Sequence, residues 1–183
     1  MEIPLRQYLS DTLGRVRDDT SGAVADYIPE LAAADPEPLA VALCTAGGRV
    51  YSAGDDEVEF TIQSISKPFA YAVALQEAGV EKVLDTVGME PSGEAFNELS
   101  LDGGTHRPVN PMINAGAIAV NQLVNGEEST VGDRVALLLD YFSRLAGRPL
   151  EVDERVTGSE LATADRNLAL AHMLRSYGVI GDS

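Results

Sequence analysis

The junction between Ile62 and Phe69 most constrains what this 183-residue chain can fold into. Before it, Glu57–Ile62 alternates apolar and polar side chains, which is typical of a strand with one buried face. After it, Phe69–Gln76 is apolar nearly all round, which indicates a buried helix. Pro68 fits a helix only in the first turn, so the helix must begin close to that residue. The sequence therefore predicts an α+β fold in which a strand leads into a buried helix.

Ahead of this junction the sequence predicts helices and a hairpin. The connector Asp35–Pro38 and the turn Ala46–Gly48 separate these elements. The expected elements are helices over Leu5–Val16 and Ala23–Ala34, the second bent near Pro29, and strands over Leu39–Thr45, Arg49–Ala53 and Glu57–Ile62.

Beyond the junction the sequence predicts mainly helices. Gly79 is a natural end for the buried helix near Ala78, and Thr130 with Asp133 forms a capping box. The expected helices cover Glu81–Val87, Met112–Val124, a segment after Thr130 with Val135 to Phe142 on its face, and Glu160–Tyr177, capped by Ser159 and ended by Gly178. Three strands make an incomplete sheet, because sheets usually have more strands and are covered on both faces.

Composition limits the possible partners and compartments. The net charge of −16 argues against binding to nucleic acid or to anionic membranes, whose phosphates it would repel. No apolar run reaches the ~18 residues of a membrane helix, and the first residues lack signal-peptide features, so we expect a cytoplasmic protein. Cys44 is the one cysteine and is expected to be a buried structural thiol. With two histidines and no zinc-type spacing, no metal site is expected.

The first chemical motif is Ser64 followed three residues later by Lys67, at the start of the predicted buried helix. Positions three apart share a helix face, so the hydroxyl and the amine can meet. A serine needs a base to become a nucleophile, and lysine can serve if burial lowers its pKa. This chain has only two lysines, Lys67 and Lys82. The alternative is a helix-capping serine followed by a solvated lysine.

Two further clusters carry polar side chains at helical spacing. Asn110 and Asn114 are four residues apart and small residues follow them, and Asn114 can hydrogen-bond a polar ligand. The alternative is a helix start followed by a packing face of small residues. Glu160 and Asn167 are seven residues apart, which on one helix places them on one face. They could hold an ammonium and a carboxylate, and the alternative is a solvated polar stripe.

Taken in order, several segments resemble the serine-dependent glutaminases of the β-lactamase-like superfamily. They are Ala25–Leu31, Gln63–Pro68, Glu90–Gly93 and Asn110–Ile118, and the likeness runs from about Tyr27 to Tyr177. The resemblance implies a β-lactamase/transpeptidase-like α+β fold, with an antiparallel sheet and a helical subdomain. It also implies one glutaminase domain over 1–183, with helices and strands to about residue 68 and a mainly helical part over about 69–183.

The resemblance also implies an amidohydrolase that converts L-glutamine to L-glutamate and ammonia without a metal or organic cofactor. Ser64 matches the nucleophile, Lys67 the lysine that activates it, and Tyr27 a tyrosine at the mouth of the site. Asn114, Glu160 and Asn167 match the residues that hold the amino-acid end of glutamine. The Ser64 N–H is a candidate oxyanion donor. The resemblance also implies that this protein forms a homo-oligomer, as related assemblies do.

The chain departs from this family in its length. Family members continue well beyond Ser183, with further tyrosines, a Lys-Ser-Gly-like strand and the remaining strands of the sheet. We therefore expect a C-terminally truncated glutaminase domain with little or no activity. Two alternatives stay open. One is a non-catalytic paralogue that binds glutamine or pairs with a full-length subunit. The other is a β-lactamase or penicillin-binding type of enzyme, although its Ser-Asp-Asn and Lys-Thr-Gly triplets do not occur here.

Overall fold

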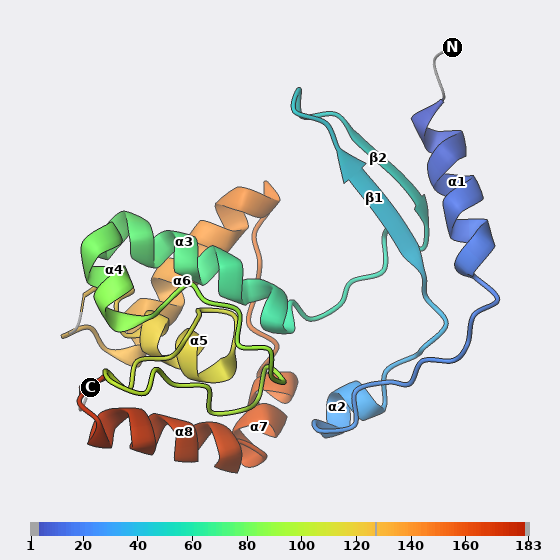
Figure 1. Cartoon of the computed structure of the whole chain (residues 1–183). Helices are drawn as coiled ribbons and strands as arrows, with labels where there is room; N and C mark the ends of the chain where they lie inside the picture. Colours follow the sequence, from blue (N-terminus) through green and yellow to red (C-terminus); the bar gives the residue numbers. More distant parts are fainter. Residues whose placement is uncertain (1–3, 127, 182–183) are drawn as a thin grey trace. The chain divides into compact units, whose positions relative to one another are not determined.

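In the computed structural model, which describes residues 4–126 and 128–181, the chain divides into two units. The first contains residues up to Thr61 together with Arg155–Glu160, and the second contains Ile62–Glu154 and the residues from Leu161 onward. The element order is helix, short helix, two strands and then helices only, so the expected α+β class is confirmed (Figure 1).

The first unit is built on an antiparallel hairpin with a helix packed against it (Figure 1). The strands are β1 (Ala40–Cys44) and β2 (Val50–Gly54), and the helix is α1 (Leu5–Val16), all close to their predicted bounds. The buried side chains of α1 are Leu9 and Leu13. Gly54 has a φ of 89°, and a Cβ there would lie 2.2 Å from the carbonyl oxygen of Leu39, so only glycine fits where β2 ends.

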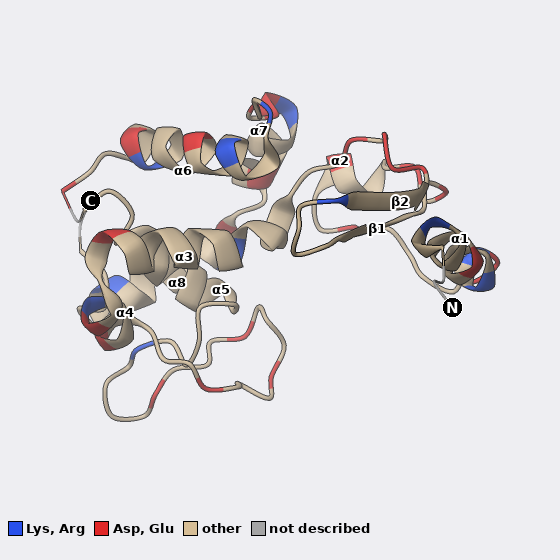
Figure 2. Ribbon diagram, turned by 90° about the horizontal axis from the view of Figure 1, so that it is seen from above, with Lys and Arg blue, Asp and Glu red and all other residues tan. Residues whose placement is uncertain are grey.

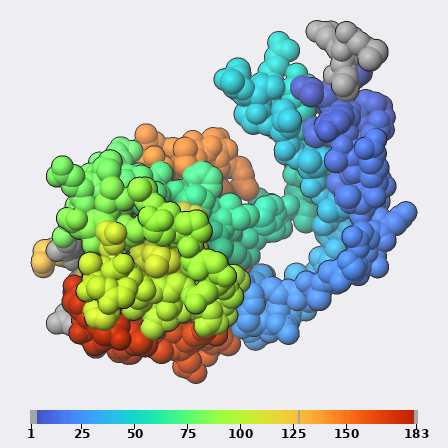
Figure 3. Space-filling view, viewed as in Figure 1, coloured from blue at the N-terminus to red at the C-terminus, as the bar shows by residue number. Residues whose placement is uncertain are grey.

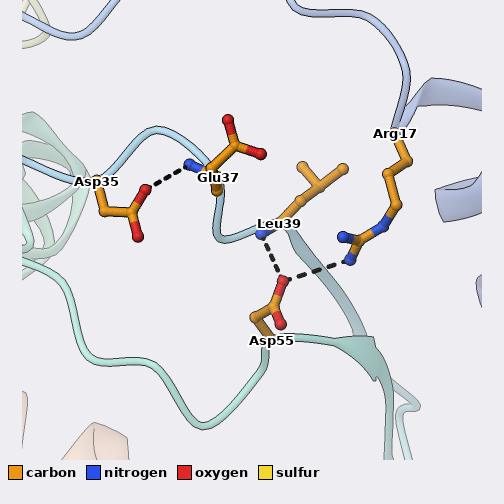
Figure 4. A network of polar contacts seen from close by, with 5 residues as sticks. All are labelled: Arg17, Asp35, Glu37, Leu39 and Asp55. Atoms are coloured by element: carbon orange, nitrogen blue, oxygen red, sulfur yellow. Dashed lines mark hydrogen bonds and ion pairs between the residues drawn. The ribbon is translucent and has the colours of Figure 1, made fainter.

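A polar cluster joins the two ends of this hairpin (Figure 4). The carboxylate of Asp55 accepts hydrogen bonds from the backbone N–H of Leu39, at 2.9 Å, and from the Arg17 guanidinium, at 3.3 Å. Nearby, Asp35 accepts from the backbone N–H of Glu37 at 3.0 Å, which tightens the connector that precedes β1. The N–H of Leu39 is the larger cause that holds the pKa of Asp55 below its ordinary value.

Three sequence expectations in this unit are wrong. The segment Glu57–Ile62 is not a strand, because an alternating pattern gives a strand only where a neighbour pairs with it, and Phe60 is 80% exposed. The helix expected over Ala23–Ala34 shrinks to α2 (Pro29–Ala32), since proline favours the first helical position and cannot continue a helix from before it. Cys44 is exposed, because it ends a strand that is mostly open to solvent.

The second unit is a set of helices around α5 (Asn114–Asn121), which carries no charged residue and is tan throughout in Figure 2. On one side, Val120 of α5 packs with buried residues of α3 (Ser66–Ala78) and α4 (Val80–Thr86), and with half-buried residues of α6 (Val131–Ala146). On the other side, Ala115 packs with Leu174 of α8 (Asp165–Ser176). This central helix is therefore held between two apolar clusters.

The second unit also confirms two local signals in the sequence. The Thr130 hydroxyl accepts from the backbone N–H of Asp133 at 3.2 Å, and so caps α6 as the capping box predicts. Gly79, with a φ of 81°, ends α3. The segment 88–113 has no helix and covers one face of this unit, green to yellow in Figure 3.

The last predicted helix is wrong as a single element. The structure has α7 (Glu154–Ala162) and α8, and the chain leaves helical geometry at Ala164, where ψ is 4°. Ser159 therefore lies inside α7 instead of capping a helix. Asp165 follows the break in the first turn of α8, where the helix dipole favours a carboxylate.

Candidate active site

The Ser-x-x-Lys motif lies where the chain enters α3. Ser64 is exposed in a 3-10 turn, Gln63–Ile65, and Lys67 is the second residue of α3. Gln63 has a φ of 44°, a left-handed conformation that costs a non-glycine residue about 1–3 kcal/mol and that clusters at functional sites. The Ser66 hydroxyl donates to the Gln63 carbonyl at 2.7 Å and so holds this turn in place.

Lys67 is half-buried, and its amine has two oxygen partners. Nζ donates to the carbonyl oxygen of Met112 at 3.0 Å and to Oδ1 of Asn114 at 2.7 Å. It also lies 5.4 Å from the centre of the Phe96 ring. Burial lowers the pKa of Lys67 from its ordinary value, because removal from water disfavours the charged form. Both hydrogen-bond partners are neutral, so neither of them raises the pKa of Lys67 as a negative charge would.

These contacts decide against the simpler interpretation of the motif. A solvated lysine would reach into water, whereas Lys67 is bound to the loop before α5 and to α5 itself. In the described chain, neither the 3-10 turn nor α3 has a side-chain cap at its N-terminus, so Ser64 does not act as a capping serine. Both side chains are described, and no hydrogen bond joins Ser64 Oγ to Lys67 Nζ. The amine is instead held on Met112 and Asn114.

Asn114 links Lys67 to α8. Its Oδ1 accepts from Lys67, and its Nδ2 donates to Oδ1 of Asn167 at 3.0 Å. Lys67 donates an N–H to Asn114, which requires Asn114 to present oxygen to it and nitrogen to Asn167. Asn167 must then accept with its own oxygen, so its NH₂ group is left to point away from Asn114. The three side chains form a chain of hydrogen bonds with one direction, and it ends in an amide donor.

Two predicted site residues, Tyr27 and Glu160, belong to the first unit. Glu160 lies on α7, whereas Asn167 lies on α8, so the expectation that two turns of one helix place them on one face is wrong. No glycine or proline marks the break between these helices, which is why periodicity missed it. Tyr27 is 59% exposed and precedes α2. The second unit therefore brings Lys67, Asn114 and Asn167 together and carries Ser64, while the roles of Tyr27 and Glu160 stay predictions.

The sequence did not reveal two of the groups around Lys67. The Met112 acceptor is a backbone carbonyl, and a backbone atom leaves no signal in residue type. Phe96 comes from the loop between α4 and α5, and its own carbonyl oxygen accepts from the backbone N–H of Asn114 at 2.9 Å. Both groups reach the lysine because the loop 88–113 folds back over α5, which only the tertiary structure specifies.

Neither a metal site nor a membrane helix is found in the described parts of the chain. Across residues 4–126 and 128–181, no three or more His, Cys, Asp or Glu side chains cluster as metal ligands would. No helix among the same residues combines the length and the apolar character needed to cross a bilayer.

Comparison with known proteins places the chain in a family. The Glutaminase family matches residues 22–183. A glutaminase of Corynebacterium glutamicum is 66% identical over 182 residues, which are 100% of this chain and 44% of that protein. "Glutaminase 2" of Bradyrhizobium diazoefficiens is 49% identical, over 98% of this chain and 28% of its own length. The chain thus spans less than half the length of these relatives.

Solved structures give the same family. The crystal structure of a protein called Mglu in its glutamate form is 52% identical, with a TM-score of 0.92, and covers 100% of this chain and 42% of its own. A probable glutaminase from Bacillus subtilis, complexed with 6-diazo-5-oxo-L-norleucine, is 30% identical, with a TM-score of 0.81 over 98% of this chain and 54% of its own. By sequence and by fold, this chain belongs to the glutaminase family.

Proposed function

We propose that this protein hydrolyses L-glutamine to L-glutamate and ammonia through an acyl-enzyme on Ser64, with Lys67 as the base. The observation that carries the proposal is the half-buried amine of Lys67, held by two neutral oxygens three residues after Ser64. The substrate class comes from relatives named glutaminase and from structures described with glutamate and with a diazo-oxo-norleucine. We treat residues 1–183 as parts of one glutaminase domain.

The contacts of Lys67 suit a neutral amine. A neutral amine has two N–H bonds and one lone pair, and here two oxygens, of Met112 and Asn114, accept its two hydrogens. The lone pair is then directed away from both acceptors and is available to accept a proton. Burial favours this neutral form, because it lowers the pKa of Lys67.

The reaction then has two steps, acylation of Ser64 and hydrolysis of the resulting ester. The Lys67 lone pair takes the Ser64 proton as Oγ bonds to the amide carbon of glutamine, and the Ser64 N–H stabilises the oxyanion. Collapse breaks the C–N bond, and Lys67 returns the proton to the leaving nitrogen, which departs as ammonia. Water next attacks the ester and gives its proton to Lys67, and glutamate leaves as Ser64 regains that proton. No electrons are exchanged with another reactant.

The amino-acid end of glutamine requires an anion and hydrogen-bond donors. The hydrogen-bond direction from Lys67 through Asn114 leaves the Asn167 NH₂ group as a donor, which suits the α-carboxylate. Glu160 is the candidate for the α-ammonium, and Tyr27 for a contact at the mouth of the site. These two assignments rest on the family resemblance. They predict higher KM values for Glu160→Gln and Tyr27→Phe.

Ammonia release from glutamine tests the proposal. We would compare this chain with Ser64→Ala and with Ser176→Ala, where the hydroxyl donates to the Met173 carbonyl of its own helix. The corresponding variants of the C. glutamicum relative would be tested in parallel. Ser64→Ala should abolish release while Ser176→Ala leaves it unchanged. A glutamyl group on the Ser64 peptide, found by mass spectrometry after quenching, would support the acyl-enzyme.

Two other outcomes would change the assignment. Full ammonia release by Ser64→Ala would overturn it. Glutamine binding by calorimetry without ammonia release from this chain would favour the non-catalytic alternative, and turnover of a chromogenic β-lactam but not of glutamine would favour the β-lactamase type. A cytoplasmic location and a homo-oligomeric state stay predictions, which cell fractionation and light scattering would test.

A further inference from the structure

We propose that Asn110 is a positioning residue, which builds the pair of oxygens that holds Lys67. The inference deepens the proposed function, since it rests on Lys67 acting as the base. Asn110 lies before α5, and its side-chain hydrogen bonds in the described chain go to Glu90, Met112 and Ile113 and not to Lys67. Its role is to fix the backbone turn that presents the Met112 carbonyl and leads into Asn114.

The half-buried side chain of Asn110 ties two segments together. Its Nδ2 donates to the carbonyl oxygen of Glu90 at 2.9 Å. Its Oδ1 accepts from the backbone N–H groups of Met112 at 3.0 Å and of Ile113 at 3.2 Å. One planar amide thus fixes the N–H groups of Met112 and Ile113. The Ile113 N–H belongs to the same peptide unit as the Met112 carbonyl. The two Lys67 acceptors follow within four residues of this amide.

The backbone of Asn110 is fixed as firmly as its side chain. A Cβ on Gly116 would lie only 1.9 Å from the Asn110 carbonyl oxygen, so α5 packs directly against this peptide. Alongside, the N–H of Glu90 donates to the carbonyl of Val109 at 2.9 Å, and the N–H of Gly88 to that of Pro108 at 2.8 Å. The turn therefore has one geometry, set from both sides.

Asparagine is the residue type that these contacts require. The amide supplies an acceptor for two N–H groups and a donor for a carbonyl in one plane. Serine would keep an acceptor for the turn, as in related side-chain turns, but could not also donate to Glu90 in that arrangement. Alanine would lose all three contacts. A looser turn would admit water to Lys67 and spread the positions of its two acceptors.

The chain has only two lysines, so lysine labelled with ¹³C at Cε gives one signal for Lys67 and one for Lys82. Each signal follows the titration of its own amine without any substrate. We would compare wild type, Asn110→Ser, Asn110→Ala and the control Asn121→Ala. The side chain of Asn121 donates to the Ala117 carbonyl, at the C-terminal end of α5. Circular dichroism would check folding, and Asn110→Ser serves if the alanine variant does not fold.

The Lys67 titration midpoint should rise in the order wild type, Asn110→Ser, Asn110→Ala, because a looser turn admits water to the amine, while Asn121→Ala leaves it unchanged. In the C. glutamicum relative, the variant that corresponds to Asn110→Ala should lower kcat about 10- to 100-fold with little change in KM. An unmoved Lys67 midpoint in the folded variants overturns the inference. Because the titration needs no turnover, it is read independently of whether Ser64 proves to be the nucleophile.

Discussion

The two units of this molecule hold their structure by different means. In the first unit, the buried apolar side chains among the described residues are Leu9, Leu13 and Ile28, and its strands are mostly open to solvent. In the second, two apolar clusters enclose α5. Hydrogen bonds such as those of Asp55 define the first unit (Figure 4), and burial defines the second. The Ser-x-x-Lys motif and its asparagines are therefore carried by the part of the chain with the larger core.

The largest expected effect tests this difference directly. Leu174→Ala removes a fully buried side chain that joins α8 to α5, and should lower the free energy of unfolding by about 2–5 kcal/mol. Leu13→Ala, at a position 7% exposed on α1, should cost less, because its surroundings are open enough to close around the gap. Denaturant unfolding, monitored by hydrogen exchange, would measure the free energy of unfolding of both variants. Equal losses would contradict the comparison.

The second prediction concerns the neutral partner of Lys67. Asn114→Asp places a carboxylate where Oδ1 now lies 2.7 Å from Nζ, and an opposite charge raises the pKa of a lysine. Because the base must be neutral, the pH at which activity rises should be higher in this variant. At neutral pH, kcat/KM should fall about 100-fold. The pH profile of glutamine hydrolysis measures this, with Asn121→Asp as control, and an unchanged profile would show that the amide is not needed.

The third prediction tests whether the cap of α6 stabilises the second unit. Thr130→Ala removes the hydroxyl that caps α6 in the second unit, and should lower the free energy of unfolding by about 1 kcal/mol. The matched control is Thr12→Ala in α1, where the hydroxyl only bonds the Tyr8 carbonyl within the helix. Thermal unfolding would measure both variants. A control loss as large as that of Thr130→Ala would rule out capping as the cause.

The smallest effect is expected from Asp55→Asn. The N–H of Leu39 above all, and the Arg17 side chain with it, lower the pKa of Asp55 below 3.8. The unfolded chain binds this proton more readily, so the carboxylate stabilises the fold above about pH 3.8, and the contribution disappears as the pH falls through the lower, folded value. Hydrogen exchange at the Leu39 amide should lose this acid dependence in Asp55→Asn but keep it in Asp18→Asn.

Local signals in the sequence predicted much of this fold. The helix α1, the hairpin, α3 with Gly79 at its end and the capped α6 each depend on residues close to one another in sequence. The failures depend on distant partners. Glu57–Ile62 alternates like a strand, but the sheet of the described residues consists of β1 and β2. The break at Ala164 has no glycine or proline to reveal it.

The site divides in the same way. Spacing made Ser64, Lys67, Asn114 and Asn167 candidates, and the family resemblance favoured a functional role for them over the alternatives. The structure joins the two asparagines to Lys67. The Met112 carbonyl could not be predicted, because every residue type carries one. Asn110 was visible in the sequence but only as a helix start. One of its three hydrogen bonds goes to the Glu90 carbonyl, twenty residues away along a loop without regular structure, and residue spacing gives no sign of it.

Gly116 has a consequence for anyone who wishes to redesign this protein. With the Asn110 oxygen 1.9 Å from where a Cβ would stand, the helix and the loop before it meet as two bare backbones. A library that randomises position 116 should return glycine alone among active clones. Redesign would then have to use other positions, because the seam between this helix and its loop offers no room for another atom.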